Sequence, residues 1–457
     1  MTRKELERRP LLLISLGLIL GISASVLIYN LAILLVCPFL LRARVPLLIF
    51  LAGTVLGIVI APPPPPEFLK STTYIESAWK VASLPHLEPY GQSCEIEHNG
   101  TRMRLAYLSR TPLCPGSTIF IRGKAKPPSE GSEDFFRSQR LVGKILADAH
   151  SVTILSPGPL LQQIGLNWRN YVMKLAQQEL TKDQAAEFGA LTFNTTSLLD
   201  DETRDDLKHT GTAHLVSASG LHVVIIATGI FALFQLLPIP RGWQIGAVVL
   251  ILSLYAIATG LNPPVVRSII MTTCANVAWI VGREPDWPSA LGLAALICIF
   301  WQPGVVFSIG FQLSFVVVLL LHMFCRRATD LSNWKAQLKS KLVTATQISV
   351  LASIIVVPLT AYYFGTCSPI SVAANLLVVW VATPVVWLGM LVAPMGFLAP
   401  AVRIVFALAF PLLAYLDWII SHLSGVAQFD VPAFSGYWLV LVFGLTLALW
   451  RPVVRQP

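Results

Sequence analysis

Residues 214–237 read HLVSASGLHVVIIATGIFALFQLL, and this stretch indicates the class of fold. Its second part, residues 221–237, is mostly apolar and is about long enough to cross a bilayer as one helix. Its first part is polar and rich in small residues, which let a helix break or let backbones pack closely. We therefore expect that His214 to Gly220 are not ordinary spanning helix and lie at the mouth of a span.

The whole chain has the composition of a membrane protein. Apolar residues make up 55% of its 457 residues and charged residues 12%, about half the share in soluble domains. One soluble domain cannot bury that much apolar surface, because single cores stop growing at about 250–300 residues. Intrinsic disorder is excluded, and seven cysteines are too few for a disulfide-rich miniprotein. We expect a polytopic α-helical membrane protein.

Apolar runs along the chain predict about twelve transmembrane helices. The first run lacks the cleavage site of a secretory signal peptide, so we interpret it as a retained span. The predicted spans cover approximately residues 11–28, 26–41, 45–61, 213–237, 243–261, 263–281, 288–302, 304–325, 343–363, 369–395, 401–422 and 436–450.

Basic residues gather in the loops that this count places in the cytoplasm, as the positive-inside rule requires. They include the basic start at residues 1–10, Arg42, Arg44, the cluster from Arg326 to Lys341, Arg451 and Arg455. We therefore expect both termini to be cytoplasmic. The basic cytoplasmic loops are the first explanation of the formal net charge of +9, and binding of a polyanionic substrate is the alternative.

Residues 62–159, after the third span, are expected to form a soluble domain outside the membrane. The domain opens with five prolines, Pro62–Pro66, which favour an extended spacer. Asn99-Gly100 is a strong hairpin signal between two strand-like runs. The predicted strands cover residues 94–98, 101–108, 117–123 and 151–155, and such short strands are typical of a small β-barrel or sandwich.

This outside domain carries a cluster of cations that suits phosphate groups: Arg102, Arg104, Arg122 and Lys124. A solvated sheet face is the alternative interpretation of the same residues. Cys94 and Cys114 lie in an oxidising compartment on this topology, which makes a disulfide between them plausible. Two unpaired thiols are the alternative.

Residues 160–190 follow the outside domain, and apolar side chains recur at helical spacing from Leu161 to Leu180. We expect an amphipathic helix that lies on the membrane surface or packs on the spans. Residues 191–457 would then form the second membrane domain, and residues 1–61 the first.

Several polar groups interrupt the apolar runs of the second membrane domain, where ionisable side chains are costly and usually functional. A helix that begins near Gly220 would direct free N–H groups toward an anion, whereas close helix packing is the alternative. Arg267 could attract phosphate or extend to the interface. Gln312 and Ser314 could form hydrogen bonds between helices, which is the first interpretation for them. Asn375 is another polar group within an apolar run.

Catalytic and cofactor motifs are missing from the sequence. It contains no Walker loop, no H-E-x-x-H and no C-x-x-C, and His214 and His222 are too far apart for one compact metal site. Ser217 or Ser219 with a histidine would make a hydrolase conceivable, yet no acidic residue is placed to orient the histidine. We expect no enzyme activity, no cofactor and no metal.

Residues 214–223, HLVSASGLHV, closely resemble the signature of the ComEC-type competence channel family. Later blocks are similar to that family in order and spacing, and residues 115–128, PGSTIFIRGKAKPP, fit its OB-like outside domain. LTFNTTSLL (191–199) departs from the family, which usually has a glycine-containing turn there. The similar blocks are ATGLNPPVVRSIIM (258–271), GREPDWPSALGLAALICIFWQPGVVFSIGFQLSF (282–315) and SPISVAANLL (368–377).

The resemblance implies a bacterial inner-membrane channel that brings single-stranded DNA into the cytoplasm during natural transformation. A charged strand needs a wet, polar path between helices, for which we expect His214, Ser217, Ser219, Gly220, His222, Arg267, Gln312 and Asn375. Many family members carry a metallo-β-lactamase-like domain near the C-terminus, and this sequence ends at Pro457 without it, so no nuclease activity is expected.

The partners that follow are single-stranded DNA, membrane lipid, a cytoplasmic motor or DNA-binding protein, an extracytoplasmic DNA receptor and a separate nuclease. Two other functions stay open at this stage. One is an intramembrane serine hydrolase that uses Ser217 or Ser219. The other is a secondary transporter of a small anionic solute.

Overall fold

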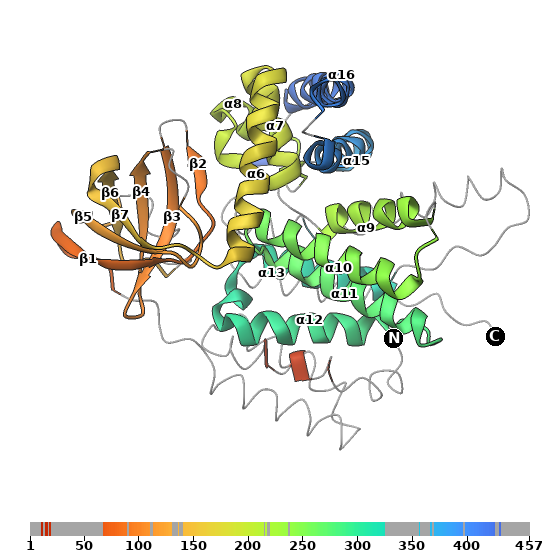
Figure 1. The fold of residues 1–457 in the computed structure, drawn as a ribbon, viewed down its shortest axis with the longest axis horizontal. Coiled ribbons are helices and arrows are strands. Elements are labelled where there is room, and N and C mark those ends of the chain that lie inside the picture. The colour runs from red at the N-terminus through yellow and green to blue at the C-terminus, as the bar shows by residue number, and fades with distance from the viewer. Residues whose placement is uncertain are drawn as a thin grey trace, which may run out of the picture.

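The computed structural model describes residues 67–324 and 370–425 and a few isolated positions outside them. Exceptions within these ranges are residues 89–90, 110–112, 130–135, 137–139, 214, 217–219, 236–237 and 396–397. Most of the predicted spans in residues 1–61, and those at 343–363 and 436–450, lie outside the described residues. Figure 1 shows a β-barrel beside several groups of helices.

Five strands close the barrel in the order β1, β3, β4, β6, β5. Their bounds are Thr73–Val81, Gly91–His98, Thr101–Leu108, Lys144–Asp148 and Thr118–Lys126. Antiparallel pairing of β1 with β5 closes the barrel, and β4 pairs in parallel with β6. A closed five-stranded barrel of this kind is OB-like, as the resemblance implies. The short strands β2 (His86–Glu88) and β7 (Val152–Ser156) pair with β3 and β5, and the 3-10 turn η1 (Ala149–Ser151) precedes β7.

The predicted hairpin is confirmed. Asn99 and Gly100 both have positive φ, 49° and 76°, and His98 pairs with Thr101 across the turn. The four predicted strands correspond to β3, β4, β5 and β7. β1 and β6 were not predicted, although both form part of the closed barrel.

The barrel interior is filled by alternating aliphatic side chains, and Ile96, Leu105 and Ile119 are fully buried there. The predicted disulfide is wrong, because both cysteines are free. Cys94 is 3% exposed and belongs to the barrel core, where burial raises the pKa of its thiol to about 12. The thiol of Cys114 instead lies against Gly158 and donates to the Pro115 carbonyl at 3.5 Å.

Where one amphipathic helix was expected, the chain forms two, α6 (Leu160–Glu179) and α7 (Lys182–Phe193). The break comes at Thr181, whose side chain caps α7 by accepting a hydrogen bond from the Gln184 N–H at 3.3 Å. The Thr196–Leu198 turn (η2) and α8 (Asp201–His209) follow, with Asp200 as the N-cap of α8.

The predicted apolar stripe of α6 is divided: Trp168, Val172 and Leu175 pack on the helices, whereas Leu161, Ile164 and Tyr171 stay exposed. Gly165 approaches α10 so closely that a Cβ would lie 2.6 Å from Ile257 Cγ2. By contrast, Leu161 is 55% exposed and Ile164 42%. Each predicted alternative therefore applies to one part of the helix: the packed side chains lie on the helices, and the exposed ones form a surface that suits lipid.

The remaining helices follow the predicted spans. Three of them, α10, α15 and α16, contain apolar segments long enough to cross a membrane: Arg241–Ala258, Ala373–Val392 and Ala399–Ser424. Exposed tryptophans such as Trp243, Trp301 and Trp380 lie on these helices and on α12, as on lipid-facing surfaces. The helix bounds are Gly220–Gln235 (α9), Arg241–Ala258 (α10), Pro263–Ile280 (α11), Trp287–Trp301 (α12), Ile309–Phe324 (α13), Ser371–Met395 (α15) and Ala399–Ser424 (α16).

Glycines let the helices approach one another closely. In Figure 1, α9 to α12 lie across the view while α15 and α16 are seen nearly end-on, so the two groups cross. At the crossing of α15 with α7, a Cβ at Gly389 would lie 2.6 Å from Thr192 Cγ2. The 3-10 turn η3 (Pro303–Phe307) joins α12 to α13, and the two-residue strands β8 (Thr366–Cys367) and β9 (Phe429–Asp430) pair with each other.

Candidate nucleic-acid interface

Arg267, on α11, is a cation buried among neutral groups. Its side chain is 7% exposed. Its Nε donates to Ser314 Oγ at 2.8 Å and its Nη2 to Ser268 Oγ at 3.1 Å, while Nη1 lies 3.4 Å from the Met271 sulfur. The expected hydrogen bond of Ser314 between helices is thereby confirmed. No described carboxylate forms an ion pair with Arg267, so its charge is solvated only by neutral groups.

The first turn of α9 lies directly against this guanidinium. The described part of α9 runs from Gly220 to Gln235, and residues 217–219 before it lie outside the described residues. A Cβ at Gly220 would lie 2.6 Å from Arg267 Nη2 and 2.4 Å from Ser268 Oγ, so a side chain there would force one of these groups to shift. The guanidinium of Arg267 creates a local positive potential, which favours an anion such as phosphate.

The other predicted path residues are not gathered at one point. His222 is 1% exposed on α9, two residues beyond Gly220. The amide of Gln312 donates to the Val306 carbonyl at 3.1 Å and so stabilises the turn before α13. Asn375 lies on α15, which packs on α9, and its Oδ1 is buried without a described partner. His214, Ser217 and Ser219 lie outside the described residues.

A row of three cations crosses the outside of the barrel. Lys144 of β6 is paired in register with Arg104 of β4 on one side and with Lys126 of β5 on the other. Arg104 also stands opposite Glu95 of β3, whose carboxyl group offsets part of the charge of the row. Lys144 and Lys126, which are like charges directly opposite each other, are the cations of the row that suit phosphates best. Sequence reasoning missed Lys144, because the five-residue strand that carries it has no clear pattern.

Of the other predicted barrel cations, two form ion pairs with neighbouring carboxylates and one lies next to the cationic row. Arg102 pairs with Glu97 at 2.9 Å, and Arg122 pairs with Glu76 at 2.8 Å. These two fit the alternative interpretation, a solvated sheet face. Lys124 is opposite Leu146 and two residues from Lys126 on the same face of β5.

A buried carboxyl group lies outside both cationic regions. Glu187 of α7 is 4% exposed. Burial, and next the nearby carboxyl groups of Asp417 and Asp183, raise the pKa of Glu187 to about 8. This carboxyl group is therefore mostly protonated at neutral pH.

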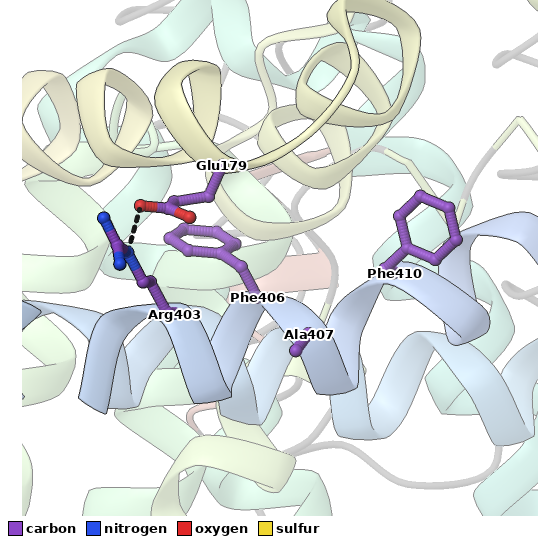
Figure 2. Close-up of a pocket in the computed structure, with 5 residues that line it drawn as sticks. All are labelled: Glu179, Arg403, Phe406, Ala407 and Phe410. Carbon is purple, nitrogen blue, oxygen red and sulfur yellow. Dashed lines mark ion pairs between the residues drawn. The ribbon is translucent and has the colours of Figure 1, made fainter. Parts of the chain in front are cut away.

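An open pocket of about 420 Å³ lies where α6 meets α16 (Figure 2). Glu179 and Arg403 form an ion pair across it at 3.7 Å, and Phe406 and Phe410 line its apolar part. It shares no residue with the cationic regions. Among the described residues, no group of three or more histidine, cysteine or acidic side chains could hold a metal ion.

Comparison with known proteins decides the family. Residues 191–455, more than half of the chain, match the family model described as competence protein. The chain belongs to the competence protein family. The matched range contains Gly220 and Arg267 but not the barrel, so the cationic row lies outside the family-defining domain.

Three curated relatives are similar to this competence protein. ComE operon protein 3 of Bacillus subtilis is 25% identical over 82% of this chain and 48% of its own length. Competence protein ComA of Neisseria gonorrhoeae is 30% identical over 52% of this chain and 36% of its own length. The uncharacterized protein YcaI of Escherichia coli is 26% identical over 55% and 35%. The chain thus spans about half or less of each relative, and no solved structure matches it.

Proposed function

We propose that this competence protein conducts single-stranded DNA across the bacterial inner membrane into the cytoplasm, along a path that passes Arg267. The observation that carries the proposal is the guanidinium of Arg267, which is buried against the start of α9 with neutral described partners. An intramembrane cation is costly to keep unless it acts on something. A passing phosphate would supply the missing negative charge and would itself be solvated by the guanidinium.

The barrel supplies the first contact in this proposal. The cationic row of Arg104, Lys144 and Lys126 would bind the phosphates of a strand that arrives outside the membrane. Such contacts are independent of sequence, as the uptake of unrelated DNA requires. OB-like barrels bind single strands by combining backbone contacts with base stacking.

In this proposal, other proteins supply the driving force for transport and deliver the DNA strand. The sequence has no Walker loop, so a cytoplasmic motor or DNA-binding protein would draw the strand inward, with both termini of this chain on the same side. An extracytoplasmic receptor would deliver DNA to the barrel, and a separate nuclease would remove the second strand. No structural observation favours the serine hydrolase or the small-anion transporter.

A photo-crosslinking experiment tests whether the strand passes Arg267. A photoreactive amino acid replaces Ser314, whose hydroxyl accepts from Arg267 Nε, in cells taking up radiolabelled DNA. The matched control places it at Trp380, which is 74% exposed on α15. We expect DNA adducts at position 314 and at least tenfold fewer at 380. The proposal is contradicted if the variant at position 314 takes up DNA normally but forms no adduct. It is also contradicted if both positions form equal amounts of adduct.

A further inference from the structure

Tyr74, near the start of β1, is an exposed aromatic residue to which no role has yet been given. Its side chain is 62% exposed. Aromatic rings are usually covered by protein, because they bury a large apolar area when they pack. The other phenylalanine, tyrosine and tryptophan side chains in the described strands of the barrel are buried or half-buried: Trp79, Tyr107 and Phe120.

Strand register gives Tyr74 a cationic and an apolar neighbour on the outside of the barrel. Tyr74 is directly opposite Lys124 of β5, and Lys124 is directly opposite Leu146 of β6. Side chains that are directly opposite on neighbouring strands have Cβ atoms about 5 Å apart. Lys124 and Leu146 face outward, because the residues next to them, Ala125 and Ile145, are fully buried.

The next register position on the same face is cationic on both strands. Lys126 lies two residues beyond Lys124 on β5 and is directly opposite Lys144 of β6. Two residues of a strand span about 7 Å, so this lysine pair lies close to the line of Tyr74, Lys124 and Leu146. These five residues form what we call the aromatic-cationic patch, and none of them is acidic.

The described carboxylates around the patch leave it positively charged. Glu76, two residues from Tyr74 on β1, is already paired with Arg122 at 2.8 Å. Asp148 lies two residues beyond Leu146, where it is opposite Leu108 at the end of β4. No described carboxylate forms an ion pair with any of the three lysines of the patch.

The patch lies on the side of the barrel that faces away from the helices. The opposite side is held to them, because buried Arg169 of α6 donates from Nη2 to the Pro85 carbonyl at 3.1 Å, just before β2. In Figure 1, β2 lies toward the helices, whereas β5 and β6 lie on the far side of the barrel. A surface turned away from the membrane helices suits an arriving DNA strand better than it suits lipid.

We infer that the aromatic-cationic patch is a base-binding site for single-stranded DNA, in which one base stacks on the ring of Tyr74 and a neighbouring base lies on Leu146. The three lysines contact the adjacent phosphates. Stacking on an aromatic side chain is open to every base, because every base has a π face. It requires unpaired bases, so the patch selects single strands over duplexes. This inference rests on the proposed function and adds that selection to it.

The first test measures the binding of oligothymidylate, and of a duplex of the same length, to the full-length protein in detergent. Tyr74→Ala should weaken binding of the single strand about fivefold or more and leave duplex binding unchanged. Tyr74→Phe keeps the ring and should bind as wild type. The matched control is Tyr171→Ala, which removes an exposed tyrosine from α6 and should also bind as wild type. Equal losses in Tyr74→Ala and Tyr74→Phe, or equal losses for single strand and duplex, overturn the inference.

The salt dependence of binding separates stacking from phosphate contacts. Tyr74→Ala should leave the slope of log K against log salt concentration unchanged, because it removes no phosphate contact. Lys126→Gln should reduce that slope by about 0.7. Wild-type binding by Tyr74→Ala together with weaker binding by Lys126→Gln overturns the base-binding site and leaves the proposed function standing. Wild-type binding by both variants overturns the site and also the role of the barrel in the proposed function.

Discussion

The contact between Gly220 and Arg267 gives a prediction whose size follows from the structure. In Gly220→Ala, the new methyl group would lie 2.4 Å from Ser268 Oγ and 2.6 Å from Arg267 Nη2. These distances are far below van der Waals contact, so α9, the Ser268 hydroxyl or the guanidinium must shift. Overpacking of this kind costs about 1–3 kcal/mol of stability.

Gly246→Ala is the matched control, because a Cβ at that position in α10 meets nothing within 4 Å. There alanine should gain up to about 1 kcal/mol from helix propensity. The two variants should therefore differ by about 1–4 kcal/mol in the free energy of unfolding. Chemical denaturation of the purified protein in detergent measures this difference, and labelled-DNA uptake measures the effect on function.

A double variant localises the cause. Ser268→Ala removes the closer of the two contacts, so adding it to Gly220→Ala should recover part of the lost stability. The loss in the double variant should thus be smaller than the sum of the two single losses, as expected for neighbouring residues whose effects are coupled. Equal stability and equal uptake in Gly220→Ala and Gly246→Ala would refute the packing of α9 against Arg267.

Three further predictions concern other parts of the molecule. Lys144→Gln should weaken the binding of single-stranded DNA by the full chain and reduce the slope of log K against log salt concentration by about 0.7. Arg122→Gln should change this slope less, because Glu76 already neutralises Arg122; titrations at several salt concentrations measure both slopes. Protonated Glu187 contributes stability that is fully present below pH 4.5 and is lost as the pH rises to about 8. The free energy of unfolding of the wild type minus that of Glu187→Gln should therefore decrease across this pH range and then level off. A flat difference would contradict it. Arg169→Met should destabilise the docking of the barrel loop by about 1–3 kcal/mol and expose residues 82–88 to hydrogen exchange, unlike Lys174→Met on the exposed side of α6.

Local sequence signals predicted the parts of the fold that depend on neighbours in the chain. Asn99-Gly100 specifies its hairpin because both residues tolerate positive φ. The cysteine pairing failed for a non-local reason, since only the closed barrel shows that the Cys94 side chain belongs to its core.

The candidate site could be predicted only as separate residues. Arg267 and Gly220 were each expected to matter, but their contact depends on how α9 packs against α11. The cationic row depends on strand register: Lys144 joins Arg104 and Lys126 because β6 inserts between β4 and β5, which no local pattern indicates.

The most direct test of the account is the delivery of radiolabelled DNA to the cytoplasm in strains that carry Arg267→Lys, Arg267→Met or Arg403→Gln. Arg403 is the matched control, a 75% exposed arginine paired with Glu179 on another helix. At equal membrane levels, the account predicts that the methionine variant loses at least tenfold of delivery, that lysine retains part of it, and that Arg403→Gln equals wild type. Full delivery by Arg267→Met would contradict the account.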